Sequence, residues 1–354
     1  MYTSILVAAA LLPAIVLCIY VFRKDRVEKE PVGLLLLLLA AGVFICFPTM
    51  HIGSWMEVII NKIFTSIATE VDGTYYLSNG LFNFYTAVDN FIGVALVEEG
   101  LKWTALLLIT RKNKNFNSLF DGMIYAIFIS LGFAGFENIL YTINYGIDTA
   151  LVRMVTAVPG HMFDAVFMGY YYSWYHIRAL ARNTEMRFRI YDLIPSDRPE
   201  ENPKKDLVYS LLVPVLAHGF YDFCCSIESP VATLVFMIFL VYLYFTCFAR
   251  IHKMSKADSR DSVYVLIILR KKYKEIASAL SEYVEHISKL HNGEELTKRI
   301  TADNLFSYML EKKSAEAEFG DREGIYSRVG YYAQKAENLG TYSDRNTDDL
   351  SEDS

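Results

Sequence analysis

The chain has 354 residues, of which 53% are hydrophobic and 21% are charged, and its formal net charge is −6. The apolar residues form blocks of about twenty, whereas a soluble globular enzyme shows short periodic runs. The blocks end near residue 250, and charged side chains dominate from there on. Composition therefore excludes an ordinary soluble protein. No run of Lys and Arg is dense enough to predict a nucleic-acid ligand.

We predict an all-α, polytopic membrane helix bundle of about seven spans, each long enough at about 1.5 Å per residue to cross the bilayer. The first span shows no small-residue cleavage site and is interpreted as an uncleaved anchor. Residues 51–70 carry charges and are predicted to form an amphipathic helix at the membrane surface. The predicted spans cover residues 4–22, 32–50, 88–110, 119–144, 155–178, 206–227 and 231–249.

The basic residues of the loops predict the orientation of this bundle. The loops after spans one, three and five contain four, three and seven Lys or Arg residues. The loops after spans two, four and six contain one, one and none. Because basic loops stay on the cytoplasmic side, we expect an outside N-terminus, a cytoplasmic C-terminus and the lipid bilayer as the surroundings of the body.

The polar end of the chain is predicted to be separate from the membrane part. We divide the chain into a multi-pass membrane domain, 1–250, and a polar cytoplasmic tail, 251–354. Apolar positions at helical spacing predict helix over residues 261–290, followed by shorter helical segments and an acidic end at 348–354. The tail is interpreted as a helical regulatory or docking segment.

Span three contains ionisable side chains where apolar ones are expected. Glu98 and Glu99 are adjacent, and Lys102 follows one turn later. A charge at the centre of a membrane helix costs about 2.5–3.5 kcal/mol on insertion scales, so such residues are functional candidates. Lys102 can reach Glu98 at i+4 or Glu99 at i+3. We therefore expect it to neutralise one carboxylate and to leave the other for chemistry.

Three later spans carry further polar side chains. These are Glu137 and Tyr141 in span four, Arg153, His161 and Asp164 at the start of span five, and His218 and Asp222 in span six. Counted from the outer ends of their spans at 1.5 Å per residue, Glu98 lies roughly 15 Å deep, and Glu137, His161 and His218 lie roughly 10–13 Å deep. This common depth predicts one site, open toward the outer leaflet. Carboxylates and imidazoles without a nucleophilic Ser or Cys suit activation of water for hydrolysis.

The two aspartates of these spans have different interpretations. Asp222 lies one turn from His218, where a carboxylate fixes the tautomer of an imidazole. Asp164 either orients a group of the site or pairs with Arg153.

Four motifs occur in a fixed order: Glu-Glu-x-x-Lys at 98–102, Phe-Glu-Asn-x-x-Tyr at 136–141, a histidine at 161 and His-Gly-x-Tyr-Asp at 218–222. With the charged turn at 26–33, they resemble the PrsW family of intramembrane proteases, over about residues 1–250. That family is related to the CAAX prenyl endopeptidases and the Abi proteins. CAAX enzymes have Phe-x-x-x-His in the second motif, and Leu140 stands at that histidine position here, which argues against a CAAX enzyme.

The resemblance implies a multi-pass peptidase of the bacterial cell membrane. It implies a single-span membrane protein as the substrate, typically an anti-sigma factor that is cut near its extracytoplasmic side. This cut begins the release of a sigma factor in the envelope stress or antimicrobial-peptide response. The resemblance implies catalytic roles for Glu98, Glu99, Glu137, His161 and His218. We predict supporting roles for Lys102, Tyr141, Asp222 and Arg153.

Two mechanisms are compatible with these residue types. The chain lacks His-Glu-x-x-His, Gly-x-Gly-Asp and Gly-x-Ser-Gly, the motifs of other intramembrane proteases. In a metalloprotease, His161, His218 and Glu137 hold zinc, with water in the fourth position. In a glutamic protease, Glu98 or Glu99 activates water directly, and the histidines stabilise the oxyanion. Two imidazoles and several carboxylates at one depth make a complete ligand set, which favours the metal.

A different class of function also uses membrane glutamates and histidines. Transporters and proton-coupled channels build proton relays from them. Internal repeats would favour that class, and the spans show none. A CAAX or Abi-type membrane endopeptidase is the alternative within the hydrolases.

Overall fold

The computed structural model describes residues 2–26, 28–199, 202–291 and 293–319, and it is predominantly helical. Contacts between Cα atoms divide the chain into two units. The first contains residues 1–176 and 203–260, and the second contains residues 177–202 and 261–354. The predicted domain boundary at residue 250 stays a prediction.

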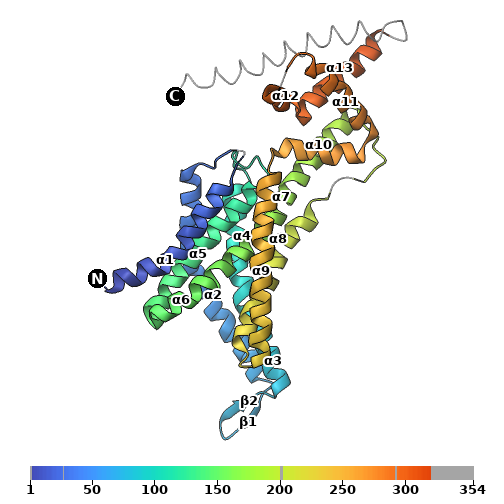
Figure 1. Ribbon diagram of the computed structural model, residues 1–354. Helices are drawn as coiled ribbons and strands as arrows, with labels where there is room; N and C mark the ends of the chain where they lie inside the picture. Colours follow the sequence, from blue (N-terminus) through green and yellow to red (C-terminus); the bar gives the residue numbers. More distant parts are fainter. Residues whose placement is uncertain (1, 27, 200–201, 292, 320–354) are drawn as a thin grey trace, which may run out of the picture. The chain divides into compact units, whose positions relative to one another are not determined.

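The first unit is a bundle of helices with one small hairpin (Figure 1). Its helices are α1 (Tyr2–Lys24), α2 (Val32–Thr65), α3 (Asn79–Val88), α4 (Leu96–Thr110), α5 (Asp121–Tyr145), α6 (Ile147–Val155), α8 (Lys204–Ser226) and α9 (Pro230–Ala257). A π-helix, η1 (Asp89–Ala95), joins α3 to α4, and α7 (Ala157–Ile190) begins in this unit. Strands β1 (Thr69–Val71) and β2 (Thr74–Tyr76) pair antiparallel, with Thr69 opposite Tyr76.

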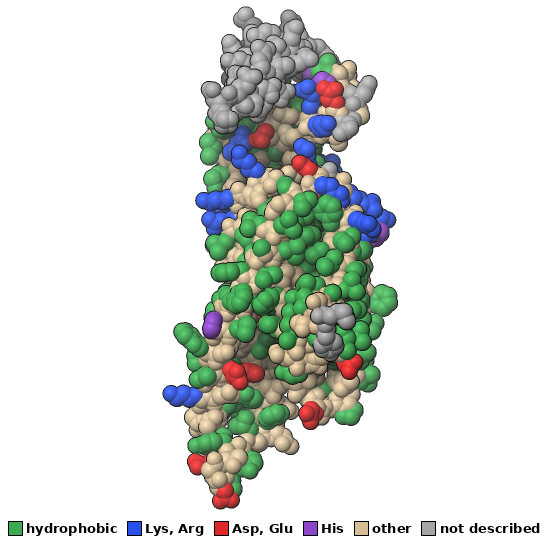
Figure 2. All heavy atoms as spheres, turned by 90° about the vertical axis from the view of Figure 1, so that its left-hand side faces the viewer, with side chains coloured by type: hydrophobic (Ala, Val, Ile, Leu, Met, Phe, Trp, Pro, Cys, Tyr) green, Lys and Arg blue, Asp and Glu red, His purple; other side chains and the backbone are tan. Residues whose placement is uncertain are grey.

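Six helical segments of the described chain are long and apolar enough to cross a membrane, which confirms the all-α, polytopic class. They correspond to every predicted span except the third, 88–110, where η1 and the charged helix α4 lie. On the face in Figure 2, hydrophobic side chains form a band over the first unit, with Lys and Arg at one end and Asp and Glu at the other. The count of seven spans and the orientation stay predictions.

Helix α2 corrects one prediction. The expected separate surface helix at 51–70 is wrong, because α2 continues without a break to Thr65. Packing against α3 explains the continuation. The ring of Phe64 lies 5.2 Å from that of Tyr85, and the Tyr85 hydroxyl donates a hydrogen bond of 2.8 Å to Asn61 Oδ1. Tertiary contacts thus extend a helix that charge patterning alone would have ended.

Helix α5 lies at the centre of the first unit and packs against α2 at backbone distance. Nearly every residue from Asp121 to Asn138 is buried. A Cβ atom on Gly42 of α2 would lie 2.0 Å from the carbonyl oxygen of Ile129, and one on Gly132 of α5 would lie 2.2 Å from that of Leu39. Small residues at a membrane-helix interface permit this approach. The result is a rigid support for the end of α5 that carries Glu137.

The second unit contains the end of α7 together with α10 (Asp261–Lys272), α11 (Lys274–Ser288), α12 (Gly293–Arg299) and α13 (Ala302–Phe319). The helix predicted over 261–290 is confirmed, with a break at Tyr273. The core includes Phe188 and Leu193 from the α7 region, packed with tail residues such as Leu269 and Phe306. The predicted acidic end, 348–354, lies outside the described residues.

Candidate active site

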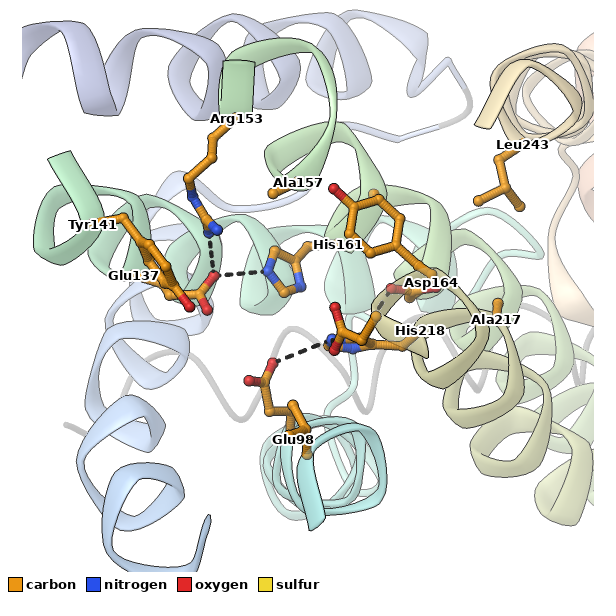
Figure 3. A pocket seen from close by; sticks show the side chains of 14 residues that line it. Glu98, Glu137, Tyr141, Arg153, Ala157, His161, Asp164, Ala217, His218 and Leu243 are labelled. Atoms are coloured by element: carbon orange, nitrogen blue, oxygen red, sulfur yellow. Dashed lines mark hydrogen bonds and ion pairs between the residues drawn. The ribbon is translucent and has the colours of Figure 1, made fainter. Parts of the chain in front are cut away.

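The predicted site residues converge on one pocket in the first unit (Figure 3). The pocket encloses about 110 Å³, which is room for several water molecules. Its polar lining is Glu98, Glu137, Tyr141, Arg153, His161, Asp164, His218, Tyr221 and Asp222, from helices α4 to α8. Glu99 and Lys102 lie behind this lining and contact it. All nine residues predicted for the site are therefore brought together.

The π-helix η1 leads directly into the glutamate pair. π-Helical turns are rare and occur frequently at functional sites. Phe91 of η1 packs against Gly219 of α8 so closely that a Cβ atom on Gly219 would lie 2.5 Å from the Phe91 ring. The glycine after His218 therefore has a packing role, because it lets the start of α4 approach the helix that carries this histidine.

Lys102 is the centre of the contacts below the pocket. Its ammonium group donates to Glu99 Oε1 at 2.7 Å, to Glu98 Oε2 at 3.3 Å and to His161 Nδ1 at 3.2 Å. The same nitrogen lies 4.1 Å from the centre of the Phe133 ring, a cation–π contact. The side chain is 1% exposed. Lys102 thus contacts both carboxylates, and the expectation that it would pair with only one is wrong.

The two adjacent glutamates have different surroundings. The side chain of Glu99 is fully buried, and its Oε1 also accepts a hydrogen bond of 2.9 Å from His218 Nδ1. Its Oε2 is buried and has no hydrogen-bond partner among the described residues. The side chain of Glu98 is 10% exposed and lines the pocket. Glu98 is therefore the member of the pair that a substrate can reach.

His161 has a defined tautomer. Lysine has only donors, so Nδ1 of His161 accepts from Lys102, and the ring proton lies on Nε2. Nε2 then donates to Glu137 Oε2 at 2.9 Å. The same oxygen accepts from Arg153 Nη2 at 2.6 Å. A carboxylate on the far nitrogen of an imidazole fixes the orientation of the ring.

His218 is surrounded by carboxylates on both sides of its ring. Nε2 lies 3.1 Å from Asp222 Oδ2, as the i, i+4 spacing predicts, and 3.9 Å from Glu98 Oε2. Nδ1, which contacts Glu99, is also 3.8 Å from Asp164 Oδ2. Of the two roles considered for Asp164, the structure shows it beside a site histidine.

Arg153, at the end of α6, holds the outer side of the site. Its guanidinium carbon lies 3.9 Å from the centre of the Tyr141 ring, and its Nε donates to Asn138 Oδ1 at 3.0 Å. Asn138 is fully buried and donates to the carbonyl oxygen of Ala10 at 2.9 Å. Sequence analysis did not assign a role to Asn138, although it stands inside the Phe-Glu-Asn motif. Tyr221 stands in the His-Gly-x-Tyr-Asp motif and was likewise given no role, and Phe133 was missed, because buried aromatic residues are common in any membrane helix.

Four of these side chains can hold a metal ion. Glu98, Glu99, His161 and His218 each offer one ligand atom, and these atoms lie within 4.8 Å of one another. Imidazole and carboxylate groups are usual zinc ligands. Glu137, which we predicted as a ligand, is not a member of this set, and its Oε2 contacts Nε2 of His161.

The arrangement of these four possible metal ligands nevertheless fits an ammonium group better than a metal ion. The nitrogen of Lys102 is within hydrogen-bonding distance of three of them. It also uses the lone pair of His161 Nδ1, which a metal ion would need. A metal ion at about 2.0–2.2 Å from the same atoms would face this positive charge at close range. As arranged, the residues do not fit a metal.

Comparison with known proteins gives a consistent result. A family profile described as PrsW family intramembrane metalloprotease matches residues 30–249, more than half of the chain. A protein named Protease PrsW from Bacillus subtilis is 31% identical over 218 residues, 62% of this chain and 81% of the relative. Those of Oceanobacillus iheyensis and Clostridioides difficile are 28% and 26% identical, over 62% of this chain and 81% and 78% of the relatives. No solved structure matches.

Proposed function

The chain belongs to the PrsW family of intramembrane metalloproteases, and from this premise we propose that Glu98 is the base that activates water for peptide-bond hydrolysis. The protein is a peptidase and a multi-pass protein of the bacterial cell membrane. One observation carries the proposal. Of the two adjacent carboxylates, Glu98 alone lines the pocket, and Glu99 is enclosed by Lys102 and His218.

In the proposed reaction, a water molecule in the pocket gives a proton to Glu98 as its oxygen attacks the substrate carbonyl carbon. Glu98 then passes this proton to the leaving amine. His218 lies beside Glu98 and is the group that we assign to the developing oxyanion. Glu137 and Arg153 act through His161, whose ring they hold in place. Tyr141 and Asp222 support Arg153 and His218 in the same way.

Imidazole and carboxylate groups are common zinc ligands, and zinc is our candidate for the metal named in the family description. We assign no step of the proposed reaction to the metal, because the Lys102 ammonium occupies the position between the possible metal ligands. Glu98, Glu99, His161 and His218 would have to provide its ligands after a rearrangement of Lys102.

We infer that the substrate is a single-span membrane protein, with an anti-sigma factor as the candidate, cut near its extracytoplasmic side. The distribution of basic loops supports an outward-facing site. The family resemblance supports the sigma-factor pathway of envelope stress and antimicrobial-peptide response.

The test uses the full-length protein in liposomes with a single-span candidate substrate. We expect the parental protein to cut it, and Glu98→Gln to slow cleavage at least about a hundredfold, since an amide cannot take up the proton. His218→Ala should also be strongly impaired. Glu57→Gln is the matched control, because Glu57 is an exposed carboxylate of α2 outside the pocket. Mass spectrometry of the products locates the cut.

Three outcomes would contradict the proposal. Cleavage by Glu98→Gln at the parental rate would remove Glu98 from the chemistry. A parental protein that cuts no candidate but moves protons across the liposome membrane would favour the transporter class. A cut near the cytoplasmic end of the substrate would refute the outward-facing site.

A further inference from the structure

The ammonium group of Lys102 is held in a complete binding site of its own. An ammonium has three N–H donors and no acceptor. The three hydrogen bonds of Lys102 go to Glu98, Glu99 and His161, and the face of Phe133 covers the same nitrogen. All three N–H donors are therefore used, and the positive charge lies beside two carboxylates. An ammonium group whose three N–H donors all have partners is expected to stay in this position.

This ammonium site coincides with the set of side chains that can hold a metal. Three of the four ligand-bearing residues of that set are the hydrogen-bond partners of Lys102, and the fourth, His218, shares the Glu99 oxygen with it. Neither cation can be close to these atoms without excluding the other. A divalent ion about 3 Å from an ammonium would be strongly repelled in a buried site.

We propose that the Lys102 ammonium is the resident cation of this site, and that a metal ion binds to Glu98, Glu99, His161 and His218 only when the ammonium is absent. Lys102 is then a positioning residue. It holds Glu99 away from the pocket, directs the proton of His161 onto Nε2 and leaves Glu98 as the accessible base. The proposal deepens the proposed function, since it names the cation that organises the reaction.

The experiment counts metal in the full-length protein, independently of cleavage. The wild type, Lys102→Gln and Lys102→Arg are purified in detergent from zinc-supplemented cells, and bound zinc is measured by mass spectrometry. Titration with Co²⁺, followed by its visible absorption, then gives the affinity. We expect no stoichiometric metal in the wild type or in Lys102→Arg, which keeps the charge. Lys102→Gln should bind at least about a hundredfold more tightly, because the repelling charge is gone.

A second substitution locates the gained metal. Adding His161→Ala to Lys102→Gln should abolish the tight binding, because one of the ligands is removed. Adding Glu57→Gln, an exposed carboxylate of α2, should leave it intact. Chelation of the wild type provides a separate readout. If the parental protein cleaves a substrate, the rate should not change after prolonged treatment with EDTA.

Several results would overturn the proposal. One tightly bound metal ion per wild-type chain would show that Lys102 does not exclude it. The proposal would also fail if Lys102→Gln folds, as judged by its thermal midpoint, and binds metal with the same affinity as the wild type. If Lys102→Gln does not fold, the number of metal ions bound per chain in the wild type and in Lys102→Arg still tests whether the charge at residue 102 excludes the metal. Because metal content is measured without a substrate, a chain that cuts nothing would contradict the proposed function and leave this inference standing.

Discussion

A single oxygen of Glu137 accepts hydrogen bonds from both His161 and Arg153. Oε2 of Glu137 accepts from both His161 Nε2 and Arg153 Nη2, while Arg153 Nε reaches Asn138. A planar guanidinium can make both contacts and stack on Tyr141 at the same time, whereas a lysine ammonium cannot reproduce this geometry. We therefore infer that Arg153 influences the proposed reaction by orienting His161 through Glu137.

We predict that Arg153→Lys lowers kcat by about ten- to a hundredfold, the usual cost of losing a partner of a functional histidine, and leaves KM nearly unchanged. Steady-state kinetics on a cleavable single-span substrate checks this. Arg260→Lys is the control, since the side chain of Arg260 is exposed and lies outside the pocket, 3.9 Å from the exposed carboxylate of Glu28. A rise in KM at constant kcat would instead place Arg153 in contact with the substrate.

The sequence predicted which side chains lie together around the pocket, but it did not predict how each of them is placed there. Glu98, Glu137 and His218 are visible because ionisable side chains are rare in apolar helices. The choice between Glu98 and Glu99 could not be made, since neighbouring side chains point about 100° apart and only the rotation of α4 decides which one faces the pocket. The contacts of Lys102 depend in addition on His161, which comes from another helix.

Among the elements, the α2–α5 pair depends on two glycines. Gly42 and Gly132 lie where the backbones of the helices touch. We predict that Gly42→Ala lowers the free energy of unfolding by about 1–3 kcal/mol, because the added methyl group forces the helices apart. The control is Gly53→Ala in the same helix, where a Cβ atom would meet nothing within 4 Å. Removal of a helical glycine there should be neutral or stabilising.

Thermal unfolding of the purified variants in detergent is the measurement for this pair. Equal midpoints for Gly42→Ala and Gly53→Ala would show that the interface yields without cost. The same pair of helices shows what could be predicted from the sequence and what could not. Span lengths and apolar content predicted α2 and α5 as helices, but the close contact between them and the continuation of α2 to Thr65 depend on residues far apart in the chain.

At the scale of the whole molecule, a cluster of acidic groups ties three segments of the first unit together. Glu30, between α1 and α2, accepts a hydrogen bond of 2.8 Å from the Tyr125 hydroxyl on α5. Asp258, after α9, accepts one of 3.0 Å from the backbone N–H of Phe120. Burial, together with the negative charge of Asp121, raises the pKa of Glu30 to about 8. Burial raises the pKa of Asp258 to about 6.

These pKa values make stability dependent on pH. Between the ordinary pKa of glutamate, 4.5, and about 8, the folded protein retains a proton on Glu30 that the unfolded chain has lost. The free energy of unfolding therefore falls as pH rises through this window. We predict a lower thermal midpoint at pH 8 than at pH 5, and a flatter dependence for Glu30→Gln. Glu28→Gln, an exposed neighbour, should keep the parental slope. Parallel curves for Glu30→Gln and the parent would contradict this role.

The second unit cannot be treated as a detachable tail, because part of its core precedes α8 in the chain. Phe188 and Leu193 are buried against side chains such as Leu269 and Phe306. The buried carboxylate of Glu185 also accepts a hydrogen bond of 2.5 Å from the Tyr273 hydroxyl. Truncation after residue 260 would expose these apolar side chains and leave the carboxylate without that partner.

We therefore predict that the chain ending at residue 260 gives far less monodisperse protein than the full chain, even though every predicted membrane span is intact. The chain ending at residue 319 is the control, since it retains the whole described core of the second unit. Size-exclusion chromatography of the solubilised proteins, at equal expression, measures the difference. Equal recovery of the two truncations would show that residues 177–202 fold without the helices that follow α9. In that case the division at residue 250 predicted from composition would describe the folding units better than the contacts do.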